Sequence, residues 1–119
     1  MPPPPKEEAR ARLRSARQVN GYTFHARDDE AGRLTDFLVD DETWVIRYLV
    51  VDTGGWLSGK QVLIAVDWLE RIDWTGQRVY TDLTRDMIEG SPDYDASAPV
   101  TREEEVVLYD YYQRPQYWI

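Results

Sequence analysis

The longest apolar run of the chain spans residues 44–51 and follows an acidic cluster at residues 40–42. Val, Ile, Tyr and Trp favour strands and acidic clusters favour turns, so residues 36–52 are expected to form a β-hairpin. The second strand of this hairpin is apolar on both faces: Val45, Leu49 and Val51 on one, and Trp44, Ile46, Tyr48 and Val50 on the other. Because a strand of this kind must be covered on both faces, we expect it at the centre of the molecule.

Alternating apolar and polar positions predict five further short strands, at residues 22–26, 33–40, 60–66, 70–74 and 77–83. The connections between the strands are too short to contain crossover helices, which favours antiparallel pairing. A sheet of this size either closes on itself or leaves exposed edges. The expected fold class is therefore all-β, a small closed antiparallel β-barrel of about six strands.

Helix signals occur after the last strand. Thr84 is expected to cap a short helix at residues 85–89, which Gly90 ends. The capping box Thr101-Arg-Glu-Glu104 predicts a helix that runs to about Tyr112, before Pro115. A similar capping box at residues 15–18 predicts one helical turn.

The expected division of the chain is a disordered, Pro-rich and basic arm at residues 1–12, a barrel domain at 13–90, and a C-terminal loop and helix at 91–119. At 119 residues, the chain suits a single barrel domain.

The net charge of −8 is unevenly distributed. Residues 1–20 carry +3, which leaves −11 for the remainder, so sequence-independent binding of nucleic acid is not expected. No apolar run is long enough to span a membrane and no secretory signal is visible, which predicts a cytoplasmic protein. Peripheral docking to a membrane complex through the basic arm is a weaker alternative.

Several stretches together resemble the PRC-barrel family. They are Leu13-Arg-Ser15, Val19-Asn-Gly21-Tyr22, Gly32-Arg-Leu34-Thr-Asp36-Phe-Leu-Val-Asp40-Asp41, Trp44-Val-Ile-Arg-Tyr-Leu-Val-Val-Asp52 and Val62-Leu-Ile64. The family is named for the cytoplasmic domain of the photosynthetic reaction centre H subunit. It also includes the C-terminal domain of a ribosome maturation factor and stand-alone bacterial proteins.

The resemblance implies a small barrel that acts as a non-enzymatic adaptor or regulatory module through protein–protein interaction. The resemblance implies no catalytic residues and no cofactor. By resemblance alone, the partner is a reaction centre-type or other membrane electron-transfer complex. The chain lacks the transmembrane helix of the H subunit and the extra N-terminal domain of the maturation factor, so neither job transfers directly.

The alternative is a module that binds a small ligand, a metal or a nucleotide. Gly54-Gly-Trp-Leu-Ser-Gly59-Lys60 has the outline of a P-loop, but Gln61 replaces the usual Ser or Thr and a strand follows instead of a helix. The acidic turns lack the ligand order of a calcium-binding loop, and His25, the single histidine, has no Cys to join it in a zinc site. No metal site and no catalytic set is expected.

The C-terminal segment is rich in aromatic residues that form a candidate interaction surface, namely Tyr109, Tyr111, Tyr112, Tyr117 and Trp118. Tyr and Trp are enriched at interfaces, which favours self-association as a homodimer. In the alternative, Val106, Tyr109 and Tyr112 lie at helical spacing and pack back to seal the barrel. The sequence leaves both alternatives open.

Arg47 is the single charge within the apolar run and must reach the barrel rim or be paired if it is buried. Asp36, on the neighbouring strand, is the expected partner in a structural ion pair.

Overall fold

The computed structural model describes residues 13–15 and 22–118. The predicted arm at residues 1–12 and the helical turn at residues 15–18 therefore lie wholly or largely outside the described residues. The described strands are β1 (Leu13–Ser15), β2 (Thr23–His25), β3 (Glu30–Asp40), β4 (Ile46–Asp52), β5 (Gln61–Ala65), β6 (Leu69–Asp73) and β7 (Arg78–Thr81). The helices are α2 (Arg85–Glu89) and α3 (Arg102–Tyr112), with the short 3-10 helices η1 (Gly54–Leu57) and η2 (Val66–Trp68) between strands.

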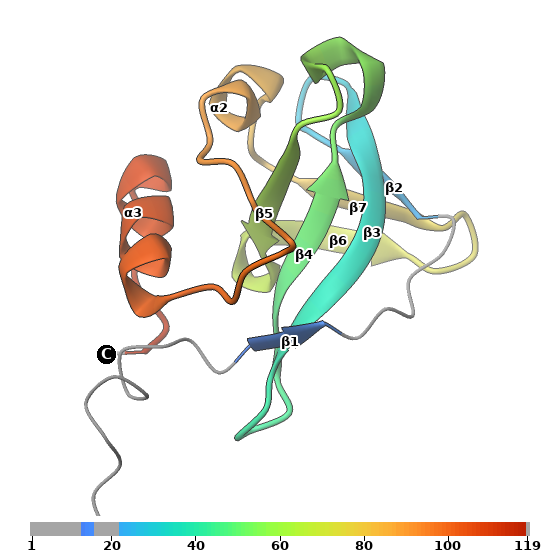
Figure 1. Ribbon diagram of the computed structural model, residues 1–119. Coiled ribbons are helices and arrows are strands. Elements are labelled where there is room, and N and C mark those ends of the chain that lie inside the picture. Colours follow the sequence, from blue (N-terminus) through green and yellow to red (C-terminus); the bar gives the residue numbers. More distant parts are fainter. Residues whose placement is uncertain (1–12, 16–21, 119) are drawn as a thin grey trace, which may run out of the picture.

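The strands form one curved sheet in the order β5-β4-β3-β2-β7-β6, and β1 pairs with β3 (Figure 1). All six predicted strands are present, with ends shifted by up to three residues. The three-residue β1 was not expected, because it is too short for an alternating pattern to show.

The prediction of a closed, wholly antiparallel barrel is wrong in two respects. β2 pairs in parallel with β7, with Thr23 beside Arg78, so the sheet is mixed. β5 and β6 are the two ends of the strand order and are joined by the chain through η2, not by a ladder of hydrogen bonds. Short connections determine only how strands that are consecutive in the chain pair. Because β2 and β7 are far apart in the sequence, the connection lengths did not predict their parallel pairing.

β3 organises the sheet. One edge of it pairs with β4, and its other edge pairs first with β2 and then with β1. Register shifts in its pairing with β4, between Leu34 and Asp36 and between Leu38 and Val39, bend the strand. Gly32 is required here, since a Cβ at this position would lie 2.2 Å from the carbonyl oxygen of Asp52.

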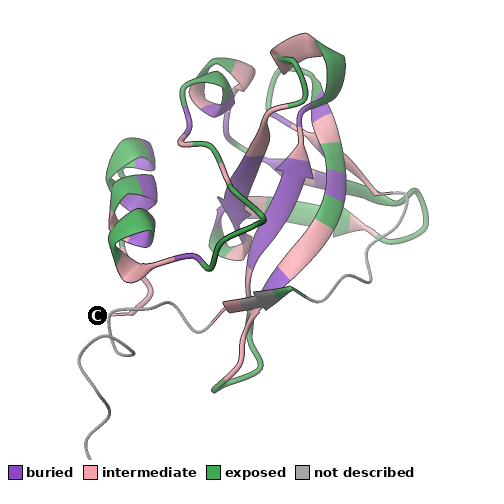
Figure 2. Ribbon diagram, in the orientation of Figure 1, coloured by how far each residue is buried: buried purple, intermediate pink, exposed green. Residues whose placement is uncertain are grey.

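The central position predicted for residues 44–52 is confirmed only for their second half. Tyr48, Leu49, Val50 and Val51 are all buried, but Trp44, Val45 and Ile46 are exposed. The difference arises because β5 covers β4 only from Tyr48 onward. The β3–β4 hairpin therefore extends past the sheet, and its tip is uncovered (Figure 2).

Both predicted C-terminal helices are confirmed, together with their caps. The Thr84 side chain accepts a hydrogen bond from the amide of Met87, and Thr101 and Glu104 form the expected capping box. The hydrophobic core is shared between the strands and α3: Val100, Leu108, Tyr109 and Tyr112 belong to the same buried cluster as the strand residues. The segment after residue 90 thus completes the core of the sheet.

Candidate functional site

The inner face of α3 carries one charged and three apolar or aromatic residues onto the sheet. Glu105, Leu108, Tyr109 and Tyr112 are buried, at the spacing of one helical stripe. The capping box at Thr101 fixes where the helix begins, and this sets the register with which the stripe meets β4 and η2.

An aromatic cluster joins α3 to the sheet. The ring of Trp68 lies 5.1 Å from Tyr109 and 4.7 Å from Tyr112, measured between ring centroids. Tyr48 meets Tyr109 and Tyr117 edge-on, each at 6.3 Å. Trp118 contacts Tyr109 at 5.1 Å. These contacts fold the last residues of the chain back over the helix and onto β4.

Glu105 lies inside this cluster with no exposed surface. Its Oε2 accepts hydrogen bonds from the hydroxyl groups of Tyr48 and, at 2.6 Å, of Tyr117. Its Oε1 lies 3.1 Å from Nη1 of Arg102, one turn earlier in α3. A buried carboxylate is stable only when such partners replace its water, so Glu105 ties β4, α3 and the C-terminal tail together.

The tyrosines of this cluster resist ionisation. Burial raises the pKa of Tyr109 and that of Tyr112 to about 12. Burial and then the negative charge of Glu105 raise the pKa of Tyr48, and burial and the hydrogen bond to Glu105 raise the pKa of Tyr117. The neutral phenols are therefore the form that the fold selects.

The predicted aromatic surface is divided by the structure. Tyr109 and Tyr112 are buried, and Tyr117 and Trp118 are half-buried in the cluster. Tyr111 is 40% exposed and donates a hydrogen bond of 2.6 Å to the carbonyl oxygen of Met87. The geometry favours the sealing alternative for Tyr109 and Tyr112. The use of this set as an interaction surface stays a prediction.

Arg47 makes a contact that the sequence did not suggest. Its guanidinium lies 4.2 Å from the centroid of the Tyr117 ring, a cation–π contact. Asp36 accepts hydrogen bonds from the Ser15 hydroxyl and, at 2.8 Å, from the amide of Phe37. Among the ion pairs recorded for the described residues, none joins Arg47 to Asp36, which the register places opposite Val50.

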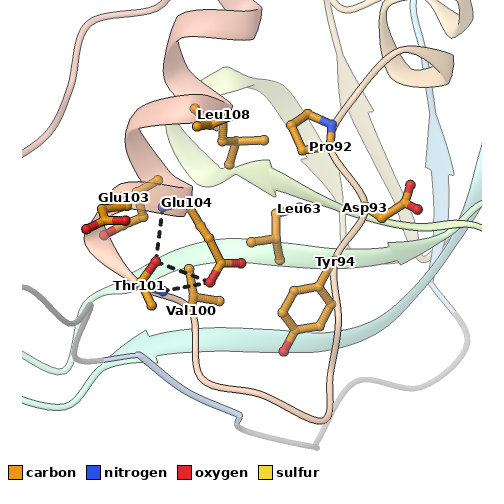
Figure 3. A pocket seen from close by; sticks show the side chains of 11 residues that line it. Leu63, Pro92, Asp93, Tyr94, Val100, Thr101, Glu103, Glu104 and Leu108 are labelled. Carbon is orange, nitrogen blue, oxygen red and sulfur yellow. Dashed lines mark hydrogen bonds between the residues drawn. The ribbon is translucent and has the colours of Figure 1, made fainter.

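A groove of about 450 Å³ runs beside α3, between the helix and the segment at residues 91–100. Leu63, Val100 and Leu108 form its apolar floor, and acidic side chains stand on both sides of it (Figure 3). Its lining comes from β5, the 91–100 segment and α3, three parts of the chain that no local motif links. For that reason, the groove was not predicted.

The tip of the β3–β4 hairpin is a second surface feature that the sequence analysis missed. Trp44 is 73% exposed, beside exposed Val45 and Ile46. Trp44 also has a φ angle of 60°, a left-handed conformation that favours Gly or Asn over a bulky residue. Stability alone does not explain a large apolar side chain at this position.

The Gly54–Lys60 loop has a structural role. Lys60 Nζ donates hydrogen bonds to the carbonyl oxygens of Glu89, at 2.9 Å, and Ser91, at 2.5 Å, and it pairs with Asp93 at 3.3 Å. The lysine thus holds the end of α2 against the loop. In the part of the chain that the structure describes, no group of three or more His, Asp or Glu side chains is arranged to hold a metal ion.

A strongly bent mixed β-sheet, sealed on one side by a C-terminal helix, defines a small β-barrel-like module. The model of the PRC-barrel domain matches residues 22–88, more than half of the chain, so the chain belongs to the PRC-barrel family. The expectation from the sequence is confirmed.

The chain is also similar to an uncharacterized protein of Deinococcus radiodurans, with 38% identity over 86 residues. The match covers 71% of this chain but only 30% of that relative. Within the described residues, no helix is long and apolar enough to cross a membrane.

Proposed function

We propose that this chain is a non-enzymatic PRC-barrel adaptor that acts by binding other proteins, and that the tip of the β3–β4 hairpin is its main contact. The observation that carries the proposal is Trp44, which is 73% exposed at a backbone angle of φ 60°. A residue that costs stability and covers no core is best explained by a partner that it contacts. Trp is also the side chain most enriched at the energetic centres of interfaces.

The same surface supports self-association, which remains part of the proposal. Tyr109 and Tyr112 are committed to the core. The apolar side chains still open to a second copy include those of the hairpin tip and exposed Tyr111. A dimer of this chain, or a complex with a different protein, would bury Trp44 in either case.

Replacement of Trp44 by Gly separates binding from folding. The variant is expected to leave the free energy of unfolding unchanged or to raise it by up to about 1 kcal/mol, because Gly adopts a positive φ without a steric penalty. The same variant is expected to lose the proteins that co-purify with the wild-type chain from its native cell, and to sediment as a monomer at concentrations where the wild type is a dimer. Denaturant unfolding, affinity purification and sedimentation velocity measure the three quantities.

Trp74 supplies the matched control. It is 68% exposed on the β6–β7 hairpin and contacts Tyr22 edge-on. Trp74→Ala is expected to keep the bound proteins. If Trp44→Gly retains the wild-type partners and the wild-type oligomeric state, the hairpin tip is not the contact. If the wild type is a strict monomer, only the self-association part of the proposal is rejected, and binding of a different protein stays as proposed.

A further inference from the structure

The groove beside α3 combines an apolar floor with an acidic border. Leu63, Val100 and Leu108 are nearly inaccessible individually, yet together they line an open depression. Val107 stands on the border and is 56% exposed, although its neighbour in the helix, Leu108, is buried. A ligand that enters the groove therefore meets aliphatic surface on its floor and on one wall.

The charged side chains at the border are predominantly negative. Glu103 and Glu104 project from the first turn of α3, and Asp93 lies on the facing segment (Figure 3). Lys60 offsets part of the charge of Asp93, with which it pairs at 3.3 Å. Glu104 is held in the capping box by Thr101, which leaves its negative charge in place at the border. A cationic group is thus attracted to the groove, and an anionic one is repelled.

A second hollow adjoins the groove at Tyr94. A neighbouring hollow of about 460 Å³ shares Tyr94 and Val100 with the groove and is lined further by Leu13, Leu38 and residues 96–99. Two adjoining hollows suit an extended or helical peptide, which can insert apolar side chains into each of them.

We infer that this groove binds a segment of a partner protein in which one or two aliphatic side chains are flanked by Lys or Arg. The aliphatic side chains cover Leu63, Leu108 and Val107, and the cations face Glu103 and Asp93. This interaction adds a second contact to the proposed adaptor. It does not depend on Trp44, so the failure of either proposal leaves the other standing.

The hairpin tip of a second copy fits less well, and the N-terminal segment of the chain is a competing occupant. The hairpin tip of a second copy carries Asp40, Asp41 and Glu42 beside Trp44, and these carboxylates would meet Glu103 and Asp93 as like charges. The N-terminal segment of the chain itself contains Lys6, Arg10 and Arg12 and joins the described chain at Leu13, so the test includes its removal.

The test measures binding of a fluorescently labelled peptide, Lys-Arg-Leu-Leu-Arg-Lys, by anisotropy at low salt, with Glu-Asp-Leu-Leu-Asp-Glu as the reference peptide. The full chain is expected to bind the basic peptide at least tenfold more tightly than the acidic one. Glu103→Lys is expected to weaken binding of the basic peptide about tenfold, and Val107→Ser about threefold.

The matched control is Glu70→Lys on β6, an exposed position away from the groove that changes the net charge equally. It is expected to change binding less than twofold. Equal losses for Glu103→Lys and Glu70→Lys would show a general attraction to an acidic protein and overturn the assignment, as would equal binding of both peptides. Circular dichroism verifies that each variant is folded.

The chain 13–119 and the Trp44→Gly variant complete the test. Both are expected to bind the basic peptide within twofold of the full chain. If removal of residues 1–12 tightens binding more than tenfold, the occupant is the N-terminal segment of the chain and the inference of a separate partner is overturned.

Discussion

Replacement of Glu105 by Ala is expected to lower the free energy of unfolding by about 3 kcal/mol. The variant removes the acceptor of the Tyr48 and Tyr117 hydroxyl groups and the counterion of Arg102. The Tyr48 hydroxyl has no route to water, because Tyr48 is fully buried, and an unsatisfied buried donor costs more than the lost bond itself. For a domain whose total stability is about 5–15 kcal/mol, this is a large fraction.

Two further variants make this prediction specific, one at Glu105 itself and one at Glu103 on the same helix. Glu105→Gln keeps the shape and one acceptor oxygen, so it is expected to cost less than Glu105→Ala. Glu103→Ala, on the exposed face of α3, is expected to change stability by no more than about 0.5 kcal/mol. Urea unfolding followed by Trp fluorescence measures all three. Equal stability of Glu105→Ala and Glu103→Ala would show that the buried carboxylate does not hold the C-terminal segment.

The second large effect is expected at alkaline pH. The folded-state pKa values of Tyr109 and Tyr112 are about 12, and those of Tyr48 and Tyr117 are also raised, whereas an unfolded tyrosine has a pKa near 10. The unfolded chain therefore releases these protons first as the pH rises. Their contribution to stability is complete below pH 10 and is lost as the pH increases from 10 through 12.

This loss can be followed by phenolate absorbance at 295 nm and far-ultraviolet circular dichroism on the same samples. Part of the phenolate absorbance is expected to appear with the same midpoint as the loss of the sheet signal. In guanidinium chloride, all eight tyrosines are expected to ionise in one transition near pH 10. Complete ionisation of the native sample before any change in circular dichroism would contradict the buried positions of these side chains.

Local signals in the sequence predicted local structure well. Alternation located the strands, and the capping residues Thr84 and Thr101 located the starts of both helices. The stretches that carry the family resemblance identified a family that is now shown for residues 22–88. In each case, the information lies within a few neighbouring residues, because strand pattern and helix capping are short-range effects.

The features that escaped prediction depend on distant parts of the chain. The parallel pairing of β2 with β7 and the open ends at β5 and β6 follow from packing of the whole sheet. Trp44 was expected to be covered, because the sequence does not show that β5 stops pairing at Tyr48. An acidic residue in the first turn of a helix is favourable at the surface, so the sequence alone does not show that Glu105 is buried by β4 and Tyr117.

The candidate surfaces changed for the same reason. The aromatic composition of the C-terminal segment predicted an interaction surface there, but Tyr109 and Tyr112 are buried in the core of the same chain. The surfaces that we propose as contacts are instead the hairpin tip at Trp44 and the groove beside α3, and both combine apolar and acidic groups. We propose that the C-terminal segment completes the fold and leaves these two surfaces to bind partners.

The role of the C-terminal segment in the fold is tested by truncation of the chain after residue 99. The shortened chain lacks α3 and the tail, and with them the buried side chains of Val100, Leu108, Tyr109 and Tyr112. Its denaturant unfolding is expected to be no longer cooperative, and its circular dichroism is expected to lack the native sheet signal at 25 °C. A truncated chain that unfolds cooperatively with wild-type stability, and has lost only the ability to associate, would show that the C-terminal aromatic segment is an interface and not part of the core.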